Sequence, residues 1–269
     1  MRTLIRLSLI IPFMVMTVFS AKAADPALIL YFTFDEQLDG RKVEDMTGNG
    51  NNGQLKWGAK ITGEPEEVYN GAGALKISGN ISAQFRVDSF NKMDRYQDHT
   101  YTFWIYLLEG FTQGAEQSIL KKNADEGAEL GGGFDQSPAI WISENNTSLW
   151  YLVGDGGIDG LGPDGEGTAF EVKKWYHIAG VKKAADLIIY INGEEKGRYN
   201  VPKNFPQGDG HLRIGGSRDR AAYFAMDDFA IYERSLMAKE VALDARGIFL
   251  SVEPRGKLAT TWSRIKISY

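Results

Sequence analysis

The chain has 269 residues, with 30 Lys and Arg against 35 Asp and Glu, and it contains no cysteine. Its formal net charge of −5 makes it a poor partner for the phosphate backbones of nucleic acids. The lack of cysteine excludes disulfides, thiol catalysis and cysteine-ligated zinc.

Residues 1–23 have the three-part pattern of a bacterial-type secretory signal peptide. Arg2 and Arg6 come first, an apolar run follows at 7–19, and the small-residue motif AKA ends the segment. The apolar run is shorter than the ~20 residues that a membrane-spanning helix needs, and Pro12 interrupts it. We therefore expect cleavage after the motif and a protein that is secreted, periplasmic or held at the cell surface.

The mature chain that this cleavage leaves is more acidic than the whole. Loss of Arg2, Arg6 and Lys22 lowers the number of Lys and Arg from 30 to 27 against 35 acids, which gives a net charge of −8. No second apolar run is long enough to span a bilayer, so we expect no membrane span. Residues 24–250 are expected to form one domain, and the polar tail at 251–269 a final strand or a docking segment.

Short segments rich in β-branched and aromatic residues, bounded by Gly, Asn, Asp or Pro, follow one another along this chain. Such segments are typical of the strands of an all-β antiparallel sandwich. The pair Asn192-Gly193 is a strong β-hairpin signal, and only residues 236–246 indicate a helix. In chain order the expected strands are ALILYFTF, YTFWIYLL, AIWIS, SLWYLVG, KWYHIAGVKK, DLIIYING, GHLRIGG and DDFAIYE.

The stretch DGGIDGLGPDGEG, residues 155–167, places acids at positions 1, 5 and 12 of a calcium loop of the EF-hand type. It lies between expected strands rather than helices, and Gly157 and Gly162 stand where that loop requires other residues, so it is not an EF-hand. Two interpretations remain open. The stretch is either a long solvated loop or a loop at the rim of the sandwich that contacts calcium or a ligand.

Seven motifs spread along the chain resemble, in this order, those of the laminin-G-like jelly rolls of the concanavalin A-like lectin and glucanase fold. The resemblance covers roughly residues 28–245. It implies two antiparallel sheets, a concave face and, in many members, a structural calcium ion. The motifs are YFTFDE, DMTGNGNNG, GAGALKISG, TYTFWIYL, KWYHIAGVKKAADLIIYINGEEKG, LRIGG and MDDFAIYERSL.

The resemblance also implies which residues bind this Ca²⁺ ion. Asp35 matches the acid that ends the first strand, Asp45 the acid that opens the glycine-rich turn, and Asp227 the first acid of the final motif. Asn49 and Asn52 add amide oxygens, which calcium accepts as ligands. The alternative is that these carboxylates only accept hydrogen bonds from turns and backbone amides.

Strand parity favours Asp227 over Asp228 as the calcium ligand. Asp227 shares the parity of the apolar residues Phe229 and Ile231, so it is expected just beyond the buried row, and Asp228 is expected to point to the other side.

Catalysis is not expected. The paired carboxylates of glucanases lie along one strand as E-x-D-x-E, and the nearest acids, Asp125, Glu126 and Glu129, lack that spacing. His177 lies within an expected strand and no G-x-S-x-G motif accompanies it. A glycoside hydrolase of the same fold remains the alternative.

Binding needs a surface, and parity places Trp141 on the opposite side of its strand from two isoleucines. Trp150 and Tyr151 lie on a neighbouring strand, followed by Asp155 and Asp159. Aromatic faces beside carboxylates suit sugars, although each aromatic residue alone could equally belong to the core. The sequence thus predicts a secreted, non-catalytic recognition module that binds a glycan, or alternatively an extracellular protein partner in adhesion or surface structure.

Overall fold

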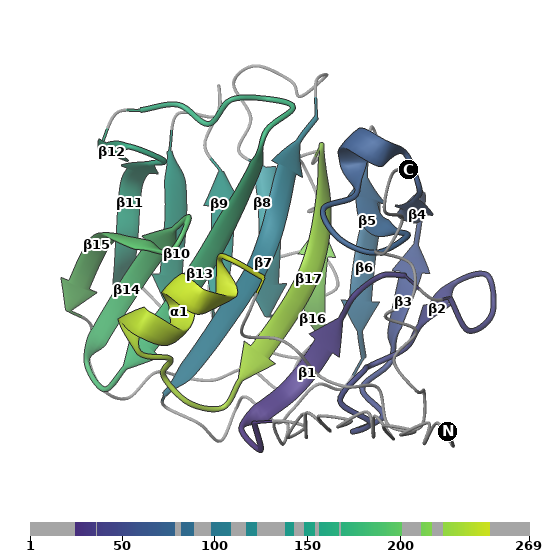
Figure 1. The fold of residues 1–269 in the computed structure, drawn as a ribbon, viewed down its shortest axis with the longest axis horizontal. Coiled ribbons are helices and arrows are strands. Elements are labelled where there is room, and N and C mark those ends of the chain that lie inside the picture. The colour runs from purple at the N-terminus through teal and green to yellow at the C-terminus, as the bar shows by residue number, and fades with distance from the viewer. Residues whose placement is uncertain are drawn as a thin grey trace, which may run out of the picture.

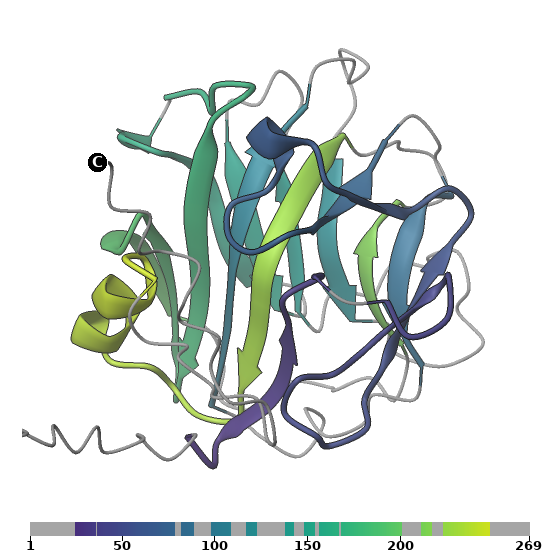
Figure 2. The same ribbon diagram turned by 45° about the vertical axis from the view of Figure 1, so that its right-hand side comes forward.

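The computed structural model describes residues 25–35, 37–78, 82–88, 98–108, 117–122, 138–142, 148–153, 156–166, 168–200, 211–216 and 223–247. Within these residues the fold is a sandwich of two antiparallel sheets with one short helix on its outside (Figures 1 and 2). The expectation of an all-β sandwich is confirmed. The predicted signal peptide and the tail at 251–269 lie outside the described residues.

The first sheet, sheet A, contains the strands that pack beneath the helix (Figure 1). Its central strands β13, β7 and β17 are long and pair side by side. In order across the sheet, the described strands are β15 (Glu194–Asn200), β14 (Asp186–Ile191), β13 (Trp175–Lys183), β7 (His99–Leu107), β17 (Phe224–Tyr232), β5 (Ala74–Ile77) and β4 (Lys60–Thr62), and β1 (Leu28–Phe32) pairs with β17.

The second sheet, sheet B, lies behind sheet A in the view of Figure 1. In order, its described strands are β12 (Gly165–Glu166), β11 (Gly156–Gly162), β10 (Leu149–Val153), β9 (Ala139–Ile142), β8 (Gln117–Lys122), β16 (Leu212–Gly215), β6 (Gln84–Val87), β3 (Gly53–Lys56) and β2 (Lys42–Val43). A single turn of 3-10 helix, η1 (Pro65–Glu67), follows β4.

The main core lies between the two sheets and is built by strand alternation. On β7, for example, Phe103 and Ile105 face the core while Thr102, Trp104 and Tyr106 point to the outer side of sheet A. The same alternation on β9 buries Ile140 and Ile142 and leaves Trp141 half-buried on the outer side of sheet B. Each sheet therefore has an outer face, and the side chains on these two faces are the candidates for function.

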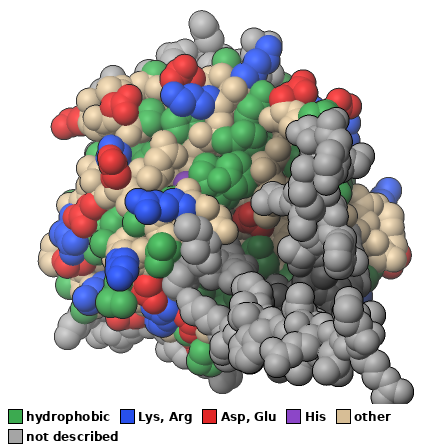
Figure 3. Space-filling view, in the orientation of Figure 1, with side chains coloured by type: hydrophobic (Ala, Val, Ile, Leu, Met, Phe, Trp, Pro, Cys, Tyr) green, Lys and Arg blue, Asp and Glu red, His purple; other side chains and the backbone are tan. Residues whose placement is uncertain are grey.

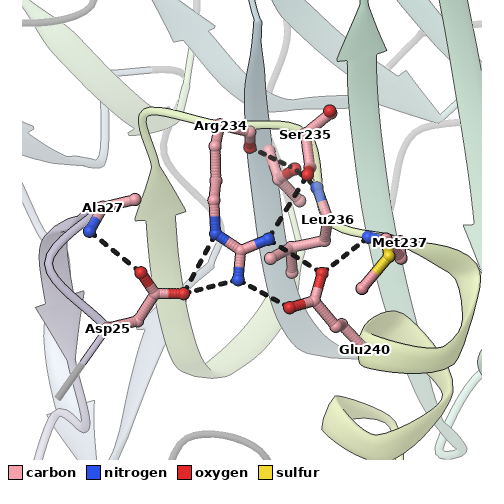
Figure 4. Close-up of polar contacts among 8 residues, drawn as sticks. Asp25, Ala27, Arg234, Ser235, Leu236, Met237 and Glu240 are labelled. Atoms are coloured by element: carbon pink, nitrogen blue, oxygen red, sulfur yellow. Dashed lines mark hydrogen bonds and ion pairs between the residues drawn. The ribbon is translucent and has the colours of Figure 1, made fainter. Parts of the chain in front are cut away.

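A smaller apolar cluster lies on the outer side of sheet A beneath α1 (Ala238–Asp244), where Val241 and Leu236 are buried against strand residues such as Ala179 and Tyr232. Arg234, at the end of β17, fixes this helix (Figure 4). Its guanidinium donates to Asp25 at the start of β1 and to Glu240 of α1, with distances of 2.5–3.0 Å. The helix is thereby tied to the segment that precedes β1 and to the residues that follow β17.

Three local predictions can be compared with the structure. The Asn192-Gly193 hairpin is confirmed, since these residues join β14 to β15 with φ of 52° and 82°. The helix is confirmed but shorter than the expected 236–246. The interpretation of residues 155–167 as a loop is wrong for most of its length, because 156–162 form β11, which pairs with β10, and 165–166 form β12. Among the described residues, no helix is long and apolar enough to span a membrane.

Candidate functional site

Asp45 organises the turn that joins β2 to β3. Its Oδ1 accepts hydrogen bonds from the Tyr31 amide (3.2 Å), the Thr47 amide (3.1 Å) and the Thr47 hydroxyl (2.7 Å). Its Oδ2 accepts one from the Asn51 amide (3.1 Å), and its own amide donates to Asn52 Oδ1 (2.9 Å). These contacts attach the turn to β1, and they match the turn-capping alternative for this carboxylate.

Asp35 and Asp227 hold a different segment, the loop at 69–73, which crosses the outer side of sheet A. Asp227 Oδ2 accepts from the amides of Tyr69 (3.1 Å) and Asn70 (3.0 Å), and Asp35 Oδ1 accepts from those of Ala72 (2.6 Å) and Gly73 (3.0 Å). The residue between Asn70 and Ala72 must be glycine. Gly71 has φ of +75°, and a Cβ there would lie 2.2 Å from Asp35 Oδ1.

The five predicted calcium ligands therefore serve two separate hydrogen-bonded segments. Asn49, the remaining one, donates through Nδ2 to the Ile29 carbonyl (3.1 Å). Among the described residues, no three side chains of His, Cys, Asp and Glu lie close enough together to hold a metal ion. The donor set in this geometry does not fit a single calcium site, and calcium binding stays a prediction.

The parity argument for Asp227 and Asp228 is wrong because β17 contains a bulge. Its register against β7 shifts between Asp227 and Ala230, and Asp228 has φ of +47°. Both carboxylates consequently leave the core and lie on the outer side of sheet A. Asp228 accepts from the Tyr31 hydroxyl (2.6 Å) and from Asn70 Nδ2 (3.4 Å).

These two adjacent acids are buried, at 0% and 9% exposure. Burial first, and then the neighbouring Asp228, raise the pKa of Asp227 to about 8, against the opposing effect of its amide donors. Burial likewise raises the pKa of Asp228. Burial and Asp228 also raise the pKa of the Tyr31 hydroxyl, so that it stays a donor.

An aromatic cluster lies beside these acids, and we call Tyr69, Trp104, Tyr106 and Trp175 the sheet A aromatics. Trp104 lies between Asp227 on β17 and His177 on β13 in the strand register. Tyr69 stacks on Trp104 with ring centroids 3.6 Å apart and an interplanar angle of 15°. Trp175 contacts both Tyr69 and Tyr106, and its Nε1 donates to the carbonyl of Glu66 (3.2 Å).

The face bearing this cluster is apolar at its centre. Figure 3 shows hydrophobic side chains gathered between α1 and the segment around η1, with acidic colour in the hollow beside them. A cleft of about 470 Å³ opens at this segment, and its described lining includes Pro65, Val68, Tyr69 and Asn70. Tyr69, Trp104 and Trp175 are all half-buried, so part of each ring is open.

His177 joins α1 to this cluster in a manner that argues against nucleophilic catalysis. Its Nε2 lies 2.7 Å from Thr102 Oγ1 and 3.2 Å from Asp244 Oδ2, and Thr102 also donates to Asp244 (2.5 Å). In a catalytic triad the acid holds the nitrogen opposite the one that faces the nucleophile. Here the acid and the hydroxyl share one nitrogen, and all three side chains are buried, so they connect the helix to the sheet.

The predicted ligand-binding residues are divided between two sides of sheet B. Trp141 and Trp150 face each other across β9 and β10 on its outer side. Tyr151 points the other way because successive strand residues alternate; it is fully buried and its hydroxyl lies 3.2 Å from His99 Nε2. Its assignment to the same surface as the tryptophans is thus wrong. Asp155 lies outside the described residues, and of Asp159 only the strand backbone is described.

Sequence reasoning missed the sheet A aromatics, although part of the signal was present. Trp104 and Tyr106 alternate with the core residues of β7 and so point to its outer side. Trp175 points to the same side from β13, the strand that pairs with β7. The contribution of Tyr69 could not be predicted in this way, because it comes from a loop that folds over the sheet. Asp228 was excluded as a site residue by the parity argument, which is invalid here because of the bulge in β17.

Solved structures with a similar fold come from proteins of several kinds. The receptor binding domain of botulinum neurotoxin type G has a TM-score of 0.58 and 16% identity, and the match covers 81% of this chain and 51% of that chain. The binding domain of Paraclostridial Mosquitocidal Protein 1 has a TM-score of 0.59 and 20% identity, and the match covers 82% of this chain and 52% of that chain. Trypanosoma rangeli sialidase has a TM-score of 0.59 and 16% identity, and the match covers 80% of this chain and 32% of that chain.

The chain thus spans about half the length of the two toxin domains and about a third of the sialidase, and at these identities the likeness shows the fold alone. No curated protein matches the sequence. The family model described as concanavalin A-like lectin/glucanases superfamily, of laminin G type, matches residues 78–242, which is more than half of the chain. The chain belongs to this superfamily.

Proposed function

We propose that this protein is a non-catalytic module that binds glycans on the outer side of sheet A. The superfamily and the binding domains among its structural neighbours support a binding module. The observation that carries the glycan proposal is that three of the sheet A aromatics, Tyr69, Trp104 and Trp175, are half-buried beside Asp227, Asp228 and Asn70.

The chemistry of this surface suits a sugar. Aromatic rings pack against the C–H faces of a pyranose, and amide and carboxylate oxygens accept hydrogen bonds from its hydroxyls. Tyr69 turns one face to Trp104 and its other face away from the sheet. The exposed side chain of Asn70, which follows in the sequence, provides a polar contact at the edge of these rings.

The surface is also held rigidly, which reduces the entropic cost of binding. Asp227 and Asp35 hold the backbone of the loop at 69–73 from two sides. Trp175 Nε1 holds the preceding segment through the Glu66 carbonyl. Tyr69 is therefore placed over Trp104 before any ligand arrives.

Two further predictions come from the sequence alone and stand apart from this geometric argument. The first is a structural calcium ion, for which the predicted ligands are already engaged in hydrogen bonds. The second is export by the signal peptide, which would present the surface to glycans or protein partners outside the cytoplasm. Trp141 and Trp150 on sheet B remain a second candidate surface, because they form a cross-strand pair.

A glycan array with the mature protein tests the function, and we expect retention of a restricted set of glycans. Retention of none, together with capture of a protein partner, would favour the adhesion alternative. The same glycans should release no reducing ends on long incubation, because general acid–base catalysis requires a positioned acid and base in reach of the substrate. Release that a single carboxylate substitution abolishes would make the protein a hydrolase.

A further inference from the structure

Two of the partly open rings on sheet A meet at a steep angle. Tyr69 lies against Trp104, with ring centroids 3.6 Å apart and an interplanar angle of 15°, so one face of Tyr69 is covered. Trp175 comes from β13, the strand next to that of Trp104, and contacts Tyr69 with centroids 5.6 Å apart and an interplanar angle of 62°. The open parts of Tyr69 and Trp175 therefore form a corner, which we call the aromatic corner.

The aromatic corner is held in place before a ligand arrives. Trp175 Nε1 donates to the carbonyl of Glu66 (3.2 Å), which ties this ring to η1. The Tyr69 amide donates to the buried carboxylate of Asp227 (3.1 Å), which ties the other ring to β17. The angle between the two rings is thus set by the fold, and a ligand has to fit it.

The sheet A aromatics do not form a flat platform. A long glycan chain packs on open ring faces that follow one another in a common plane. Tyr69 and Trp104 are nearly parallel, but they are stacked on each other and do not follow one another along the surface. Tyr106 lies at 44° to Trp175 and is buried, at 5% exposure. A corner instead contacts a single sugar residue on two sides, its C–H face on one ring and its edge on the other.

The surroundings also limit the length of a ligand. Figure 1 shows α1 and the segment around η1 on opposite sides of the central strands of sheet A. The cleft that Tyr69 helps to line has a volume of about 470 Å³, within the range of about 300–1,000 Å³ that is typical of small-molecule sites. These dimensions suit one or a few sugar residues rather than the continuous length of a polysaccharide.

On this basis, and resting on the proposed function, we infer that the aromatic corner binds the terminal residue of a glycan chain. The face of this sugar packs on Tyr69 and its edge contacts Trp175, while the exposed amide of Asn70 is available to its hydroxyls. Trp175 blocks extension of the chain on one side, so the rest of the chain leaves the surface on the other. Interior residues, which are linked on both sides, do not fit the corner.

Titration calorimetry with chains of increasing length tests this inference. The probes are neutral β-linked glucans and galactans, from disaccharide to hexasaccharide, and a size-fractionated soluble polymer of each sugar that is long enough to hold many copies of the protein. We expect one protein per chain at every length, with an affinity per chain that stops rising after the first few residues. Several copies on each polymer chain, with an affinity that keeps rising with length, would overturn the inference and leave glycan binding intact. Binding of neither series would also overturn it, and the glycan array would then decide the proposed function.

Trp175 provides the variant that tests the corner itself. Trp175→Ala should weaken binding of the disaccharide and of the polymer by the same factor, roughly tenfold, because both contact this ring only through a terminal residue. Trp175→Phe, which keeps a ring but cannot donate to Glu66, should keep one protein per chain. The matched control is Tyr199→Ala, which removes a ring of 45% exposure on the edge strand β15 and should bind as the parent does. Unchanged affinity in a folded Trp175→Ala, or a loss confined to the polymer, would contradict the inference.

Discussion

The two outer faces of the sandwich carry similar side chains in different surroundings. On sheet A, Trp104 lies beside the buried Asp227, Trp175 lies on the next strand, and a loop and a helix rise on either side of them. On sheet B, Trp141 and Trp150 pair across two strands beside a lysine. The alternation of core and outer side chains along a strand thus predicts which aromatic residues lie on an outer face. Residues distant in the sequence determine the charge and shape around them.

The largest expected effect concerns stability on the sheet A side. Asp227→Ala removes the acceptor of three backbone amides, those of Tyr69, Asn70 and Asp228. Each buried donor left without an acceptor costs about 1–3 kcal/mol, so the free energy of unfolding should fall by roughly 3–5 kcal/mol in denaturant titrations. Asp227→Asn, which keeps one acceptor oxygen, should lose less. Equal stability of Asp227→Ala and the parent would show that this carboxylate does not hold the loop.

A second effect on the stability of this side concerns pH. Asp227 has a pKa of about 8 in the folded protein and an ordinary value of 3.8, so between these values the folded chain binds a proton that the unfolded chain has lost. This contribution to stability is fully present below about pH 4 and is lost as the pH rises through about 8. The melting temperature should fall between about pH 4 and pH 8, and Asp227→Asn should flatten the slope. A slope unchanged by the substitution would assign the effect to other groups.

The smallest expected effect is that of chelation. A calcium ion present at a hundred times its dissociation constant would add about 2.7 kcal/mol to the native state, and excess EDTA would then lower the melting temperature. The hydrogen bonds that occupy Asp35, Asp45 and Asp227 require no ion, and on this geometry we expect no change. A clear decrease that Asp227→Asn abolishes, with calcium found by elemental analysis, would confirm the calcium prediction.

The fold could be predicted from the sequence because its signals are local. Strands such as β7 and β13 carry alternating core residues, and the turn at Asn192-Gly193 requires positive φ. The glycine-rich β11 was taken for a loop, because pairing with β10 rather than propensity makes it a strand. A prediction from one strand at a time cannot describe such pairing.

The site depended still more on distant contacts. The bulge that turns both Asp227 and Asp228 outward inverts a parity argument, and no pattern in the sequence around them announces it. Tyr69 reaches Trp104 only through a loop whose amides are held by carboxylates far away in sequence. Tyr151 was grouped with its neighbour Trp150, although adjacent strand residues face opposite sides.

The central claim is that sheet A, and not sheet B, binds the ligand. The most direct measurement compares glycan retention by Tyr69→Ala and Trp150→Ala, both at half-buried aromatic positions, with melting temperatures recorded to confirm folding. We predict that Tyr69→Ala loses about tenfold or more in affinity, since a stacked ring contributes on the order of 1–3 kcal/mol, and that Trp150→Ala binds as the parent does. Loss of binding in Trp150→Ala with full retention in a folded Tyr69→Ala would contradict the account and move the site to sheet B.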